Sequence, residues 1–195
     1  MITDALLAFV PLGAPLSLVG AAGVAIPSSQ IIDLLGAGVG VNPAAAGQIW
    51  GNTTNFGQAD AMGVGNQRPE LNVTVGTALA GAAGLTLNVK LQGAPDPGAA
   101  GNWTPTNASF VNLGGQDGIT LAQGAAGTVI ARLPWLPPFP VNLRPRFLRL
   151  LFSPVSNGGA DPSGAFTAGT IASALVVMSR DDYFASQQPR NFTVS

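Results

Sequence analysis

The side chains available for chemistry in this chain are few, and the two most versatile types are missing. Its 195 residues include no histidine and no cysteine, and only eight basic and nine acidic residues. Histidine is the usual proton shuttle near neutral pH, and cysteine is a common nucleophile or metal ligand. The sequence therefore excludes thiol and histidine-based catalysis, and we expect neither an enzyme nor a cofactor.

The remaining motifs that could do chemistry are incomplete. Asp181 and Asp182 form the one adjacent pair of acidic residues, and we interpret them as a solvated turn rather than a hard-cation site. The segment 114–118 (GGQDG) resembles part of a calcium loop but lacks its further acidic residues. The glycine-rich segments 36–38 and 63–65 precede no predicted helix and no GKS/T motif, so neither is a phosphate loop. The sequence predicts no metal site.

The charge balance argues for an assembly and against nucleic acid. The net charge is −1, which gives no general electrostatic grip on phosphates. Such a small net charge also gives a free monomer little colloidal protection, so we expect other copies of the chain (a dimer or trimer) or another protein as partners. The local basic concentration at Arg132, Arg144, Arg146 and Arg149 is interpreted as charge that protects an edge strand.

The apolar N-terminal segment is predicted to be an arm. A signal peptide fits poorly, because Asp4 occupies the place of a positive region and Pro11 and Pro15 interrupt the apolar stretch. The same prolines argue against a membrane helix, and no membrane partner is expected. Thr3 is expected to cap a short helical turn over residues 4–7, with the remainder extended along a surface.

Two segments are predicted to offer partner contacts. The first is the arm, which is too apolar to stay in water and should lie on a neighbouring subunit, so that a chain without residues 2–13 would still fold. The second is the proline-stiffened segment 133–140, which either covers the protein's own core or contacts a partner. The predicted contact residues are Ile2, Leu6, Leu7, Phe9, Val10, Trp135 and Phe139.

The interior of the chain has the period of two that is typical of β-strands. Residues 70–75 and 85–92 alternate polar and apolar side chains, which places one apolar face inward. Further β candidates are residues 30–35, 109–113, 128–133, 146–152 and 166–178. With glycine-rich turns between them, such as residues 114–118, and no long helix, they predict an all-β sandwich, barrel or jelly roll. The residues predicted to face inward are Leu71, Val73, Val75, Leu85, Leu87, Val89, Leu91, Leu148, Leu150 and Phe152.

These elements give a three-part organisation. Residues 1–28 form the predicted N-terminal arm, and residues 29–179 form the predicted β domain, a sandwich, barrel or jelly roll with long glycine-rich loops. Within it, residues 42–68 are too long for an idle loop and are predicted to rest on another surface. Residues 180–195 form a C-terminal tail.

Several segments, taken in order, resemble the capsid cement (decoration) proteins of certain tailed bacteriophages. The matching segments are residues 1–9 (MITDALLAF), 29–34 (SQIIDL), 63–65 (GVG), 85–92 (LTLNVKLQ), 146–150 (RFLRL) and 164–171 (GAFTAGTI). Two segments depart from the family pattern, because residues 42–61 are longer than expected and the tail extends past the last strand. They could contact partners that simpler members lack.

The resemblance implies a jelly roll on the outer surface of an icosahedral virion, where it clamps neighbouring major capsid proteins against internal DNA pressure. It implies no direct contact with nucleic acid. A competing class is a carbohydrate- or receptor-binding β-sandwich of a virion or fibre, in which Trp50, Trp103 and Trp135 could stack on sugars. A third class, a secreted hydrolase, lacks the histidine that it would need.

Overall fold

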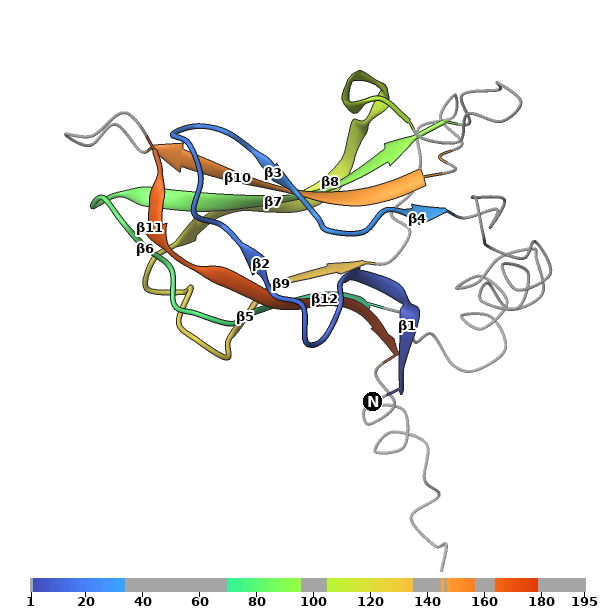
Figure 1. Cartoon of the computed structure of the whole chain (residues 1–195), viewed down its shortest axis with the longest axis horizontal. Helices are drawn as coiled ribbons and strands as arrows, with labels where there is room; N and C mark the ends of the chain where they lie inside the picture. The colour runs from blue at the N-terminus through green and yellow to red at the C-terminus, as the bar shows by residue number, and fades with distance from the viewer. Residues whose placement is uncertain are drawn as a thin grey trace, which may run out of the picture.

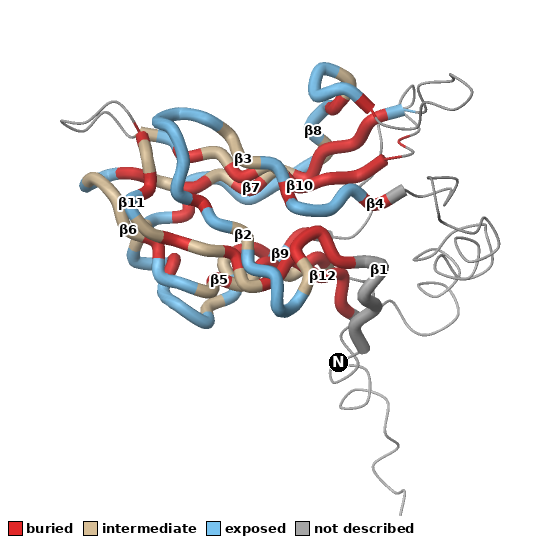
Figure 2. Tube along the Cα trace, in the orientation of Figure 1, coloured by how far each residue is buried: buried red, intermediate tan, exposed pale blue. Residues whose placement is uncertain are grey.

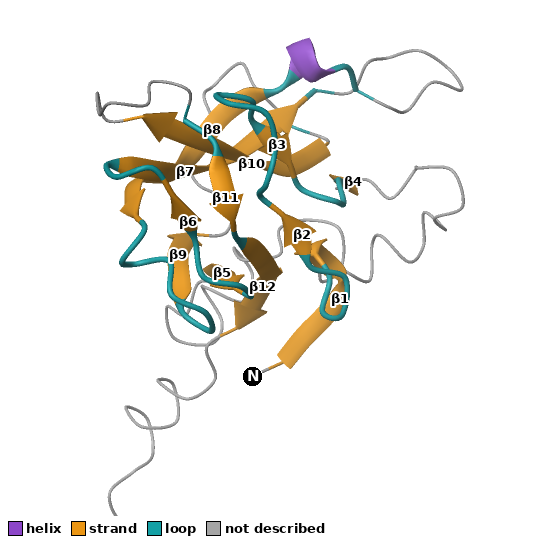
Figure 3. Cartoon of the chain, turned by 60° about the vertical axis from the view of Figure 1, so that its left-hand side comes forward, coloured by secondary structure: helices purple, strands orange, loops and turns teal. Residues whose placement is uncertain are grey.

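The chain folds as an all-β sandwich, which confirms the predicted fold class (Figure 1). The computed structural model describes residues 2–33, 70–95, 105–134, 145, 147–156 and 164–178. Within these ranges the helical structure is one short 3-10 turn, η1 (Asn107–Ser109), drawn in purple in Figure 3.

The described strands form two stacked sheets and one small ribbon. The first sheet has the order β1 (Ile2–Val10), β12 (Thr170–Met178), β5 (Glu70–Val75), β9 (Val129–Pro134), and β2 (Leu16–Ser17) also pairs with β12. The second has the order β3 (Ile26–Pro27), β10 (Phe147–Ser156), β7 (Leu85–Ala94), β8 (Val111–Thr120), and β4 (Ile32–Asp33) also pairs with β10. The ribbon joins β6 (Ala80–Gly81) to β11 (Phe166–Ala168).

The pairing of the longer strands is nested. The first strand, β1, pairs with the last, β12, and β3 and β4 pair with β10. Further inside, β5 pairs with β9, and β7 pairs with its chain neighbour β8. All of these pairs are antiparallel, so the chain resembles a long hairpin whose two arms are rolled together.

The core lies between the two sheets and follows the period of two (Figure 2). In β5 and in the first six residues of β7, buried and half-buried residues alternate. All ten residues predicted to face inward are buried, and Leu85, the most exposed of them, is only 3% exposed. The predicted inward face is therefore confirmed.

The N-terminal segment is part of the sandwich, so the prediction of a separate arm over residues 1–28 is wrong for its described part. Ile2–Val10 forms β1 instead of the helical turn expected at residues 4–7. β1 pairs with the edge of β12, with Ala8 opposite Leu175 and Val10 opposite Ala174. This pairing provides hydrogen-bond partners for the backbone of β1. A strand that pairs in this way needs no helical turn to satisfy its N–H and C=O groups.

The glycine-rich segment 114–118 is also strand, not a turn or a calcium loop. It lies inside β8, the edge strand of its sheet, and is accommodated by bulges. At one of them Asn88 of β7 faces both Asp117 and Gly118. Gly118 has φ of +69°, a left-handed conformation that favours glycine.

Several predictions fall outside the described residues. These are the loop excursion 42–68, the tail 180–195, and most of the proline-rich segment 133–140. They stay predictions.

Candidate interaction surface

One segment crosses from the first sheet to the second along the side of the sandwich. We call residues 11–31, which follow β1 and include β2 and β3, the strap. β2 pairs with β12 of the first sheet, and β3 pairs with β10 of the second (Figure 1). Residues 5–32 contain no charged side chain. The strap is therefore an uncharged segment that spans both layers.

Hydrogen bonds fasten the strap to the strands beneath it. The Ser28 N–H donates to the Leu150 carbonyl (2.8 Å), and the Leu150 N–H donates to Ser28 Oγ (3.1 Å). The Gln30 N–H donates to the Phe9 carbonyl (3.0 Å). Near β2, the Leu18 N–H donates to the Gly169 carbonyl (3.0 Å), and the Leu18 side chain is buried in the core. These anchors fix the backbone of the strap.

Most residues of the strap other than these anchors are exposed, and four of the exposed side chains are large and aliphatic. Leu12 is 69% exposed, Val19 and Val24 are each 52% exposed, and Ile31 is 43% exposed. Figure 2 shows most of the strap as exposed tube. Exposed aliphatic side chains are individually ordinary, but a fixed, uncharged segment that displays four of them is a candidate protein contact.

The strap replaces part of the predicted contact surface. Phe9 and Val10 are each 0% exposed and belong to the chain's own core, so their prediction as partner contacts is wrong. Ile2, Leu6 and Leu7 lie on β1, but the structure does not describe their side chains. Trp135 and Phe139 lie outside the described residues, as do Trp50 and Trp103. The absence of charge over residues 5–32 was the signal that could have identified the strap.

A second candidate surface, the outer face of the β10–β7–β8 layer, carries a row of polar side chains. Arg149 of β10 lies opposite Gln92 of β7, which lies opposite Asn112 of β8. Arg149 Nε donates to Gln92 Oε1, and Gln92 Nε2 donates to Asn112 Oδ1, both at 2.9 Å. The turn η1 folds over this row, so that Arg149 Nη1 donates to Asn107 Oδ1. The Arg149 guanidinium carbon lies 3.9 Å from the centre of the Phe110 ring.

This arrangement corrects the interpretation of the arginines. Arg149 is 6% exposed in a central strand, and its partners are neutral amides and an aromatic ring. Desolvation by burial lowers the pKa of Arg149 from its ordinary value, although arginine stays charged in proteins. Arg132 does lie exposed on β9, an edge strand. Of the two arginines of this group that the structure describes, only Arg132 therefore fits the predicted role of protecting an edge, and Arg144 and Arg146 lie outside the described residues.

Because Arg149 joins three strands and a turn, its removal should destabilise the sandwich. Arg149→Met keeps much of the stem but leaves the carbonyl oxygens of Gln92 and Asn107 without this donor. We expect the free energy of unfolding in urea to fall by about 1–3 kcal/mol. Arg132→Met, the exposed control, should change it by less than about 0.5 kcal/mol. Equal effects of the two substitutions would contradict the structural role of Arg149.

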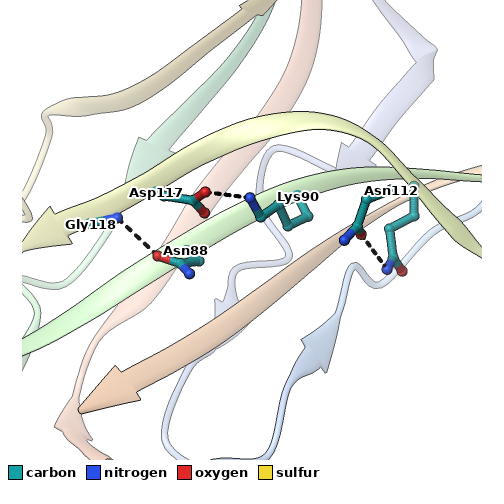
Figure 4. A network of polar contacts seen from close by, with 6 residues as sticks. Asn88, Lys90, Asn112, Asp117 and Gly118 are labelled. Atoms are coloured by element: carbon teal, nitrogen blue, oxygen red, sulfur yellow. Dashed lines mark hydrogen bonds and ion pairs between the residues drawn. The ribbon is translucent and has the colours of Figure 1, made fainter. Parts of the chain in front are cut away.

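Further along the same face, two polar contacts link β7 to β8 (Figure 4). Asn88 Oδ1 accepts a hydrogen bond from the Gly118 N–H at 2.9 Å. Lys90 Nζ forms an ion pair with Asp117 Oδ2. Asn88 and Lys90 are two residues apart on one strand and therefore share a face. Together they hold the bulge of β8.

Neither a metal-binding cluster nor similarity to known proteins identifies another site in the described residues. The described ranges contain no group of three or more acidic side chains placed to hold a metal ion. Their helical structure includes no segment with the length and hydropathy of a membrane span. No model of a known protein family matches the chain, and no curated protein matches it significantly. The case for the strap as the candidate interaction surface therefore comes from its structure alone.

Proposed function

We propose that this chain is a cement (decoration) protein, which binds the outer surface of an icosahedral phage capsid and stabilises contacts between major capsid proteins. The observation that carries the proposal is the strap, an uncharged segment fixed to the sandwich with Leu12, Val19, Val24 and Ile31 exposed. Such a role needs a rigid body and a contact surface, and it needs no catalysis.

The nested strand pairing supports the finer fold assignment within this proposal. Pairing of the first strand with the last, and of each inner strand with its counterpart, is what rolling one long hairpin into two sheets produces. We infer a jelly roll from this order, in agreement with the fold that the family resemblance implies. The second support is the resemblance of several sequence segments, in the same order, to the cement proteins.

The proposed interface works through apolar contact. The four aliphatic side chains of the strap are between 43% and 69% exposed, so the transfer of each onto a capsid protein would contribute about 1–2 kcal/mol. Exposed ion pairs would contribute about 0.2–1 kcal/mol each, and the chain has only eight basic and nine acidic residues to form them. Many copies on one shell, or a dimer or trimer of this chain, would reinforce these contacts through multivalency. Binding only the expanded lattice would stabilise that lattice by mass action.

The test is cosedimentation of the purified protein with expanded shells that lack it. Charged substitutions in the strap, Leu12→Asp with Val24→Asp, should weaken binding at least tenfold, because two aspartates would lose their hydration at the interface. Val155→Asp is the matched control, since Val155 is 39% exposed on β10 and outside the strap. It should bind like the wild type.

Salt provides an independent readout of the same interface. Occupancy of the wild type should change little between about 0.05 and 0.5 M salt, although the Debye length falls from about 14 to 4 Å. Release of most copies at high salt, or normal binding by the double variant, would contradict the proposed interface. Retention on a polysaccharide column without binding to shells would favour a carbohydrate-binding module instead.

A further inference from the structure

Asp117 is the one aspartate in the chain that is followed by glycine. In an Asp-Gly pair the glycine nitrogen can attack the aspartate side-chain carbon Cγ. This forms a C–N bond, releases one water molecule and closes a five-membered succinimide ring. Water then opens the ring at either carbonyl, giving aspartate or isoaspartate with no oxidant or cofactor. Glycine favours the reaction because it has no Cβ to obstruct the ring closure.

The surroundings of this pair are unusual for such an exposed position. The Asp117 side chain is 57% exposed on an edge strand, where water is freely available. Gly118 has the permissive φ of +69°. Exposure, water and a flexible glycine are the conditions under which an Asp-Gly pair reacts. Yet both reacting groups are engaged by side chains of β7.

We propose that Asp117-Gly118 is a latent isoaspartate site, and that Asn88 and Lys90 keep it unreactive in the folded protein. Asn88 Oδ1 holds the Gly118 N–H at 2.9 Å, so the attacking nitrogen is tied to β7. The Lys90 ammonium holds a carboxylate oxygen of Asp117. Attack requires the nitrogen and Cγ to approach each other, and each restraint opposes one half of that movement.

The site's position makes its reaction consequential. Isoaspartate moves the main chain through the former side chain and adds one methylene group to the backbone. β8 already contains bulges in its pairing with β7, and one of them includes Asp117 and Gly118. A further backbone atom there would shift the remaining ladder and expose the edge of β7. This reaction would age the fold whatever the protein's function.

The experiment measures isoaspartate in the intact chain at neutral pH and 37 °C over several weeks. Peptides that contain residue 117 are separated after proteolysis, and isoaspartate is identified by electron-transfer fragmentation. The folded wild type is compared with the urea-unfolded wild type and with the folded variants Asn88→Ala and Lys90→Met. Circular dichroism verifies that each variant stays folded.

We expect at least tenfold slower isomerisation in the folded wild type than in the unfolded chain. Asn88→Ala and Lys90→Met should each accelerate it by about five- to tenfold, the effect of losing one hydrogen bond or partly exposed ion pair on local opening. Ser153→Ala is the matched control, because Ser153 lies opposite Asn88 on β10 and makes neither restraint. It should isomerise at the wild-type rate.

Three further results decide the assignment. Asp117→Glu should remove the signal, because a glutamate side chain would have to close a six-membered ring, which forms much more slowly than the five-membered succinimide. Equal rates in the folded and unfolded wild type would overturn the proposal. Unchanged rates in both the Asn88 and Lys90 variants would also overturn it, because protection would then come from the strand alone.

Discussion

Phe9→Ala is expected to lower the free energy of unfolding by about 3–5 kcal/mol, the usual cost of truncating a buried phenylalanine. Phe9 is 0% exposed and belongs to the main core cluster, although it comes from the N-terminal strand. Its carbonyl also accepts the hydrogen bond from the Gln30 N–H. Since domains of this size are stable by about 5–15 kcal/mol, the loss would be a large share. Urea denaturation followed by circular dichroism measures it.

The matched control is Leu12→Ala, three residues further along the chain. Leu12 is 69% exposed in the strap, so its truncation should change the free energy of unfolding by less than about 0.5 kcal/mol. A stable Phe9→Ala variant would restore the hypothesis that the N-terminal segment is a separate arm. By the same reasoning, a chain without residues 2–13 should not fold normally, contrary to the expectation from sequence.

Gly115→Ala is expected to cost about 2–4 kcal/mol, because the new methyl group would collide with the neighbouring strand. A Cβ on Gly115 would lie 2.3 Å from the Val89 carbonyl oxygen and 3.1 Å from the Lys90 Cα. Both atoms are backbone atoms of β7, so relief of the collision requires the β7–β8 ladder to separate. Thermal unfolding and urea denaturation would both register the loss.

Gly20→Ala serves as the control for this substitution. The atom nearest to a Cβ on Gly20 is Ile26 Cδ1 at 3.4 Å, an ordinary contact. The free energy of unfolding of the Gly20→Ala variant should stay within about 0.5 kcal/mol of the wild-type value or rise slightly, because alanine restricts the conformations of the unfolded chain. Wild-type stability of Gly115→Ala would mean that β7 and β8 pair less closely than described.

The sequence was sufficient to predict the body of the sandwich. In β5, β7 and β10, every second residue is buried, because one face of each strand packs on the core. Leu71, Leu87 and Leu150 follow this alternation and are each fully buried. Local pattern therefore determines these strands, and the partner of each strand follows only from the three-dimensional structure.

The strand β1 and the larger part of β8, residues 114–120, were missed because irregular pairing hides their pattern. A register shift between Ala8 and Val10 lets the consecutive residues Phe9 and Val10 both join the main core. The run therefore has no period of two. In β8, Gly115 lets the strand lie close to β7, and Gly118 lies in a bulge. In the sequence, these glycines were interpreted as a turn.

The candidate surface could be predicted only in part. An uncharged N-terminal segment with contact potential was visible in the sequence, but the division between its inner and outer residues was not. Leu18 is buried whereas Val19 is exposed, and this depends on the hydrogen bond that ties Leu18 to Gly169, far along the chain. Arg149 was placed at an edge for the same reason, since strand order is not local information.

The nested pairing determines when the molecule can fold during its synthesis. β12 lies between β1 and β5, so the first sheet cannot form until the ribosome has released Thr170–Met178. At a synthesis rate of about 5–20 residues per second, β12 is made roughly 10–35 s after β1. Contacts between segments so distant in sequence also close slowly. During that interval Phe9 and Val10 are exposed apolar residues of the nascent chain, which makes this stage of synthesis the one most open to aggregation.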